Sequence, residues 1–227
     1  LIAARLPTTV HLVLMAVFFS GLVSIPAGVI AAIKKNTAVD RGLSFLMTLG
    51  VSSPVFLNGI LLMLLFSLKL GWFPAFGAGR GFLENCYYLF LPAAALSWSM
   101  VALMGRICRS RMIEELASPY ALALKAKGTV PRNIVLRHCL PNTLVPVITV
   151  AGVQAGTMVV GAALVENVFA LGGIGQLLIE SVKASDYPVV QSVILLLVSL
   201  FLLITLAVDM IYALIDPRIR QARAANG

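Results

Sequence analysis

Long hydrophobic runs without a charged residue dominate the chain and predict its secondary structure. A transmembrane helix needs about 20 mostly apolar residues, because the hydrocarbon core is about 30 Å thick and each residue rises about 1.5 Å. Charge-free stretches of that length predict five helices, at about 11–33, 43–68, 88–108, 142–165 and 189–211. Pro26 and Pro54 lie inside two of them and are expected to kink them. The pattern predicts an all-α membrane protein, a polytopic helical bundle.

Composition supports this fold class. Hydrophobic residues make up 60% of the 227 residues and charged residues 11%, and the mean hydropathy is +0.99. A soluble domain carries about 25% charged residues, because water must wet its surface. Buried helices of a soluble core are disfavoured, since almost nothing of the chain would remain to coat them.

The basic residues predict the orientation of the helices, because lysine and arginine are retained in cytoplasmic loops. If the loop at 34–41 is inside, 13 basic and five acidic residues face the cytoplasm, and four of each face outward. The net charge of +8 then lies on one face. It reports membrane topology, and nucleic acid is not an expected partner. The C-terminal tail, 214–227, is expected in the cytoplasm.

This orientation places the N-terminus outside, although the sequence does not open with the charged and then apolar pattern of a signal peptide. We therefore expect at least one further helix to precede residue 1, so that the five helices would be the last five of six.

No catalytic or metal-binding motif is found in the sequence. The phosphate-binding loop G-x-x-x-x-G-K-[ST], the zinc motif H-E-x-x-H and the hydrolase motif G-x-S-x-G are missing, and neither the three cysteines nor the two histidines have metal-ligand spacing. The span interiors also hold no carboxylate, lysine or arginine, which ion-coupled carriers usually need. Transport driven by another chain is therefore favoured over a self-sufficient channel or secondary carrier, which remains the alternative.

The loop at about 109–141 is long for a connection between membrane helices and carries its own helix signals. Ser118 is a candidate N-cap with Pro119 at the first helical position, and Gly128 supplies the stop. A second helix is expected from Arg132 to Leu140, and Pro141 marks the start of the next span. This basic helix–turn–helix finger either lies on anionic lipid headgroups or docks a cytoplasmic protein, and its residues favour neither interpretation.

The finger resembles the coupling loop of permease subunits in ATP-binding-cassette importers, whose loose pattern is E-A-A, three residues, Gly, nine residues, then I-x-L-P. Gly128 matches the glycine and Leu140-Pro141 the final pair, whereas Leu122-Ala123-Leu124 replaces E-A-A and His138 the isoleucine. The dipeptide/oligopeptide/nickel branch, with Y-V-R-T-A-R-A-K-G followed by R-H-x-L-x-N, is a closer match. The matching residues are Tyr120, Lys125-Ala126-Lys127-Gly128, Arg137-His138, Leu140 and Asn142.

Further matches to this branch occur in order along the chain. They are Leu6-Pro7-Thr8-Thr9, Leu70-Gly71-Trp72-Phe73-Pro74, Val165-Glu166-Asn167-Val168-Phe169, Gly173-Ile174-Gly175, Asp186-Tyr187-Pro188-Val189 and Asp216-Pro217-Arg218-Ile219-Arg220. Each motif is weak by itself, but the ordered set covers essentially the whole chain.

The resemblance implies a type I ABC importer transmembrane domain over about 4–213, in a bacterial inner membrane. It implies a second permease, two cytoplasmic ATPases that hold the ATP and Mg, and an extracytoplasmic substrate-binding protein; the chain itself would be non-catalytic and cofactor-free. The finger would occupy a groove of one ATPase. The expected coupling residues are Tyr120, Ala123, Lys125, Ala126, Lys127, Gly128 and Arg137.

Two further sets of residues have open alternatives. Asn58, Gln154, Gly152 and Gly156 lie within spans and either line the pathway or pack helices together. Glu166, Asp186 and Tyr187 either contact the binding protein or anchor the outer loop. Di- or oligopeptides or glutathione-like peptides are the favoured substrates, and nickel is the alternative within the same fold.

Overall fold

The computed structural model of the protein describes residues 1–79 and 81–215, and every regular element within them is a helix. The α-helices are α1 (Ile2–Ile33), α2 (Ala38–Ser52), α3 (Val55–Leu62), α4 (Phe82–Leu116), α5 (Pro119–Ala126), α6 (Pro131–Asn133), α7 (Leu140–Phe169), α8 (Ile174–Lys183) and α9 (Tyr187–Ile215). Two π-helical segments, η1 (Met63–Lys69) and η2 (Ile134–Cys139), extend α3 and precede α7.

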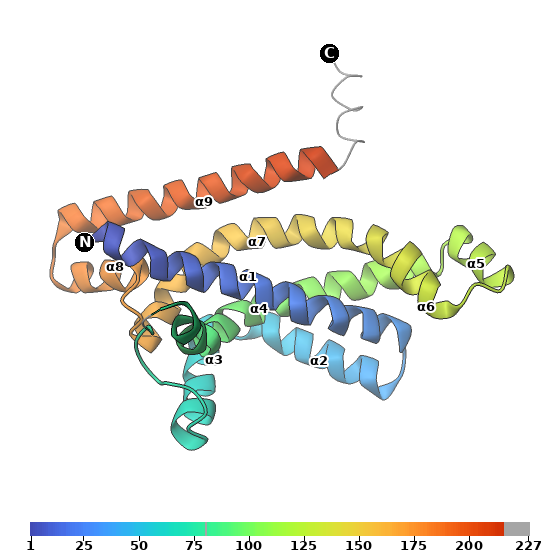
Figure 1. Ribbon diagram of the computed structural model, residues 1–227, viewed down its shortest axis with the longest axis horizontal. Helices are drawn as coiled ribbons and strands as arrows, with labels where there is room; N and C mark the ends of the chain where they lie inside the picture. The colour runs from blue at the N-terminus through green and yellow to red at the C-terminus, as the bar shows by residue number, and fades with distance from the viewer. Residues whose placement is uncertain (80, 216–227) are drawn as a thin grey trace, which may run out of the picture.

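Helix α4 lies at the centre of the bundle and packs against α1, α2, α3 and α7. Its buried residues include close neighbours such as Leu91, Ala93 and Ala95, so the helix is covered on more than one side, as expected of a central helix. Helices α1, α4 and α7 run along the long axis, with α5 and α6 at one end and α8 at the other (Figure 1). Helix α9 packs along α7 and α8. The elements nearest the two ends are therefore the finger and α8.

Within the described residues, four continuous helices are long and apolar enough to cross a membrane, and a bent pair, α2 with α3–η1, counts as a fifth span if taken together. The helix axis bends by 114° between the two halves of that pair. The expected kink at Pro54 is thus a full break, because the residue before a proline is forced out of the helical region: Ser53 is extended, with φ −90° and ψ 133°. Helix α1, in contrast, continues through Pro26.

Helices α1, α4, α7 and α9 extend beyond the charge-free stretches that predicted them, because turns with charged residues continue them past the apolar region. The stretch at 42–68 is instead divided between α2, α3 and η1. The span predicted to begin at Pro141 begins as α7 at Leu140, with Pro141 in its first turn. The helical segment before it is continuous with α7, so that helix runs from Pro131 to Phe169 without a loop. Its π-helical turn, η2, ends directly before Leu140-Pro141. A widened turn changes which carbonyl faces the proline ring, so the helix tolerates the missing N–H. The predicted tail at 214–227 lies almost entirely outside the described residues.

Candidate functional site

The first helix of the finger is bounded by the residues that its sequence predicts. The finger comprises residues 118–139, and its helix α5 begins with Ser118 at the N-cap, whose hydroxyl accepts a hydrogen bond from the amide of Ala121 at 3.4 Å. At the other end, the amide of Gly128 donates to the carbonyl of Lys125 and that of Thr129 to Leu124, both at 3.1 Å. This pair of bonds is a Schellman motif, and Gly128 provides the positive φ, +78°, that it needs.

The hydroxyl of Tyr120 ties the finger to both long helices beside it. It hydrogen-bonds the carboxylate of Glu115 at the end of α4, and the amide of Asn142 in α7 donates to both Glu115 and Tyr120 at 3.2 Å. Burial, together with the bond to Glu115, raises the pKa of Tyr120 to about 12, so the phenol stays protonated. The hydroxyl of Tyr120 therefore serves as an internal anchor, and only part of the ring is left on the finger surface.

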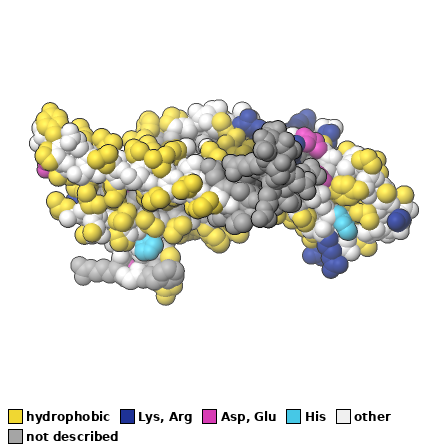
Figure 2. Space-filling model, turned by 90° about the horizontal axis from the view of Figure 1, so that it is seen from above, with side chains coloured by type: hydrophobic (Ala, Val, Ile, Leu, Met, Phe, Trp, Pro, Cys, Tyr) yellow, Lys and Arg dark blue, Asp and Glu magenta, His cyan; other side chains and the backbone are white. Residues whose placement is uncertain are grey.

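The other predicted coupling residues lie on the surface of the finger. Ala123, Lys125, Ala126, Lys127 and Gly128 are exposed on α5 and its turn, and Arg137 is exposed on η2. Exposed apolar side chains lie among them, with Leu122 55% and Val130 60% accessible. The dark-blue lysine and arginine side chains that stand out in Figure 2 lie in the half of the molecule towards the finger. Mixed apolar and basic surface of this kind suits a protein groove with acidic edges.

The small residues of α7 bring it close to α9. A Cβ atom added at Gly152 would lie 2.0 Å from Cγ1 of Val208, and one at Gly156 would lie 3.0 Å from the ring of Phe201. Of the two interpretations of this stripe, close helix packing fits these contacts. Gln154, between the two glycines, is half-buried.

Asn58 lies one turn into α3. Its amide donates to the hydroxyl of Ser53 at 3.0 Å. It thereby spans the break between α2 and α3, which again fits packing better than a pathway.

Of the three residues predicted for the outer face, one is buried and two are exposed. Glu166 is fully buried, so the prediction that it contacts a binding protein is wrong, and the alternative of a loop anchor fits. Its carboxylate accepts hydrogen bonds from the hydroxyl of Thr9 at 2.6 Å and from the amides of Gly175 at 2.7 Å and Gln176 at 3.1 Å. Asp186 caps α9 through the amide of Val189 at 3.3 Å.

Asp186 also lies on the surface, beside Tyr187, which is 70% accessible. These two residues keep both of their predicted interpretations, binding-protein contact and loop anchor.

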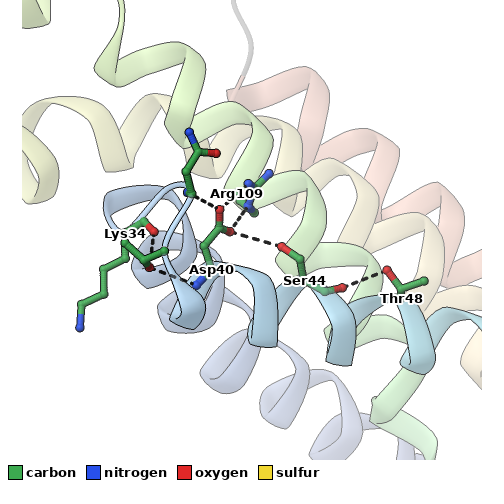
Figure 3. Close-up of polar contacts among 7 residues, drawn as sticks. Lys34, Asp40, Ser44, Thr48 and Arg109 are labelled. Carbon is green, nitrogen blue, oxygen red and sulfur yellow. Dashed lines mark hydrogen bonds and ion pairs between the residues drawn. The ribbon is translucent and has the colours of Figure 1, made fainter.

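Sequence reasoning missed an ion pair between the start of α2 and the C-terminal half of α4. Arg109 donates from Nε to Oδ1 of Asp40 at 2.6 Å and from its terminal nitrogen to Oδ2 at 2.8 Å (Figure 3). The amide of Asn36 and the hydroxyl of Ser44 also bond this carboxylate. Asp40 follows the N-cap Thr37 by three residues, which signalled a helix start but gave no indication of its partner, 69 residues away.

No cluster that would hold a metal ion occurs in the part of the chain that the structure describes. Groups of three or more His, Cys, Asp or Glu side chains close enough to share a metal are not found there. His11 instead bonds Asn85 at 3.3 Å.

Together, the apolar spans and the basic finger define a polytopic helical membrane protein. Comparison with known proteins gives the family. The chain belongs to the family of binding-protein-dependent transport system inner membrane components, whose family model matches residues 24–221.

Relatives within this family are similar over nearly the whole chain. The di/tripeptide transport system permease protein DppB of Pseudomonas aeruginosa is 38% identical over 240 residues, covering 96% of this chain and 71% of the relative. The glutathione transport system permease protein GsiC of Escherichia coli K12 is 37% identical over 219 residues, covering 96% and 70%.

Solved structures show the same fold. An inward-facing structure of the MetNI methionine ABC transporter matches with a TM-score of 0.77 at 22% identity, over 95% of this chain and 96% of that one. An amino acid ABC transporter crystallised with histidines matches with a TM-score of 0.65 at 15% identity, over 96% and 93%. The chain therefore has the transmembrane fold of type I ABC importers.

Proposed function

We propose that this chain forms half of the translocation pathway of an ATP-driven importer for di- or oligopeptides, including glutathione-like peptides, and that its finger is the element on which an ATPase acts. The observation that carries the proposal is the combination of an exposed finger surface with a fixed finger base. Glu115, Tyr120 and Asn142 join α4, α5 and α7 in one hydrogen-bonded node. A force on the finger is therefore transmitted to two long helices at once.

The partners follow from the family to which the chain belongs. A second permease would complete the pathway, two cytoplasmic ATPases would hold ATP and Mg²⁺, and an extracytoplasmic protein would deliver the substrate. The basic finger would be cytoplasmic, as would the C-terminus. Asp186 and Tyr187, exposed at the α8 end, are the residues proposed to meet the binding protein. ATP closure of the ATPases would move the finger and shift the helices between inward- and outward-open arrangements.

A cross-linking experiment tests the docking of the finger. In the assembled complex, with Cys86 replaced by serine, a cysteine at Ala126 should cross-link to an ATPase subunit. Ala184 is also an exposed alanine but lies in the turn after α8, so a cysteine there is the matched control and should capture no ATPase. Equal capture at both positions, or at neither, would contradict the docking assignment.

A transport assay tests coupling. Lys127→Glu and Gly128→Pro should each lower ATP-dependent uptake of a labelled dipeptide in the full complex, because the first reverses a charge on the docking surface and the second imposes a φ near −65° where +78° is needed. If both variants transport at the unchanged rate, the finger does not couple.

The same assay separates the alternatives. Transport by this chain alone in liposomes, at the same rate without ATP, would identify a self-sufficient channel or carrier. Saturable uptake of nickel in place of peptides would leave the importer function intact and overturn only the substrate.

A further inference from the structure

The turn between α1 and α2 presents a positive charge that its own acidic residue does not neutralise. Lys34, Lys35 and Arg41 are exposed, and none of them pairs with a carboxylate within the described residues. Asp40 lies among them in sequence, but it is only 3% accessible and its charge is bound by Arg109. In Figure 3 the side chain of Lys34 extends away from Asp40. The outward charge of this turn is therefore +3, although its sequence suggests +2.

An apolar groove of about 150 Å³ lies beside this turn, where α1, α2 and α4 meet. Its floor is shallow because small residues hold the helices together: a Cβ atom at Gly50 would lie 2.6 Å from that of Ala102, and one at Gly105 would lie 2.8 Å from Met47. The lining residues are Val23, Ala27, Leu43, Leu46, Met47, Trp98, Val101 and Ala102. The groove has the chemistry of a site for a hydrocarbon chain.

The spacing between the cations and the groove matches a phospholipid. Lys34 follows Ala27 by seven residues, which places both on one face of the helix with about 10 Å between them along the axis. On α4, the exposed Arg106 lies one turn, about 6 Å, beyond Ala102. Each headgroup layer of a bilayer is about 5–7 Å thick. When the groove lies in the hydrocarbon layer, the cations lie at headgroup level.

We propose that an anionic phospholipid binds here, with its phosphate between Lys34 and Arg106, Lys35 and Arg41 beside it, and an acyl chain in the groove. An anionic headgroup is selected over a zwitterionic one because the withdrawn carboxylate of Asp40 leaves no negative charge at the turn to bind a choline or ethanolamine ammonium. A soluble phosphate would use the cations but leave the apolar groove uncovered.

The test uses Trp98, which lines the groove and is 39% accessible. The chain has two tryptophans, so Trp72→Phe leaves Trp98 as the only one. The full-length variant is placed in nanodiscs of phosphatidylcholine containing increasing fractions of phospholipid with brominated acyl chains, which quench nearby indole fluorescence. We expect brominated phosphatidylglycerol to reach half-maximal quenching at a mole fraction at least about fivefold lower than brominated phosphatidylcholine does.

Charge variants distinguish this site from general attraction to the basic end. Lys34→Gln, Lys35→Gln and Arg41→Gln combined should make the two quenching curves coincide. Lys125→Gln, Lys127→Gln and Arg132→Gln combined remove the same charge from the finger and should leave the preference intact. Coincident curves for the unchanged turn, or equal loss in both triple variants, would overturn the proposal.

A groove variant covers the case in which the first triple variant fails to fold. Ala27→Phe keeps every cation and fills the groove, so it should weaken quenching of Trp98 by both brominated lipids. Undiminished quenching in this variant would show that no acyl chain occupies the groove.

Discussion

Glu166 joins three helices at the end opposite the finger, and replacing it with alanine should weaken their association and lower the stability of the protein. The carboxylate projects from the last turn of α7, accepts the hydroxyl of Thr9 from α1, and accepts the amides of Gly175 and Gln176 from the first turn of α8. The hydroxyl of Thr9 in turn accepts the amide of Ile174 at 2.9 Å. Negative charge at a helix N-terminus is also favourable because it opposes the positive end of the helix dipole.

The expected cost of Glu166→Ala can be worked from these contacts. The substitution leaves two backbone amides and one hydroxyl without their acceptor in a fully buried place. Each buried donor left unpaired costs about 1–3 kcal/mol, and the hydroxyl can rotate towards another acceptor, so the sum is about 3–5 kcal/mol. Since about 1 kcal/mol shifts the unfolding midpoint of a chain of this size by about 2–4 °C, the midpoint should fall by about 6–20 °C.

Thermal unfolding of the detergent-solubilised protein, followed by intrinsic fluorescence, measures this shift. Glu180→Ala is the matched control, because Glu180 lies in α8, is 46% accessible and pairs with Arg5 at 2.9 Å. An exposed pair contributes about 0–1 kcal/mol, so this midpoint should move by only about 0–4 °C. Glu166→Gln keeps the size and the two amide bonds and should lie between the two alanine variants. Equal midpoints for both alanine variants would refute the anchor; weaker association with a binding protein at an unchanged midpoint would restore the surface interpretation.

Three other substitutions test the packing and the finger. Tyr120→Phe should leave the helices in place but speed hydrogen exchange of the α5 amides about 5- to 30-fold, because losing the hydroxyl node costs about 1–2 kcal/mol locally. Gly152→Ala should lower the unfolding midpoint, since overpacking against α9 costs about 1–3 kcal/mol, whereas Gly42→Ala, where a Cβ atom meets nothing within 4 Å, should leave it unchanged or raise it. Asp40→Ala should destabilise the protein by about 2 kcal/mol or more, and Arg109→Ala added to it should cost little further, as a double-mutant cycle by thermal unfolding would show.

Local signals in the sequence predicted much of the finger correctly. Ser118, Pro119 and Gly128 were each assigned the helix-end position that the structure gives them, because capping depends on hydrogen bonds within a few residues. The break at Pro54 follows from an equally local clash. The π-helical form of the turn before α7, η2, was not predicted, since such a turn has no strong sequence signature.

Contacts between distant segments were beyond sequence reasoning. Glu166 was placed in an outer loop with two interpretations, and only the convergence of Thr9 and the α8 amides shows that it is buried. Tyr120 matched a coupling-loop pattern, yet its hydroxyl points to Glu115 and Asn142. In each case the partner lies on another helix, and its approach depends on how the helices pack.

By itself the sequence determined that the chain is a helical membrane protein, which face is basic, and where the finger begins and turns, because lipid, loop charge and helix capping act on residues close together in the chain. The tertiary structure decided which polar groups are buried, as with Glu166 and Asp40, and which cations remain uncompensated beside an apolar groove. The groove in turn depends on the close packing of α2 and α4 at Gly50 and Gly105. A charge counted along the chain is therefore not the charge that the folded surface presents.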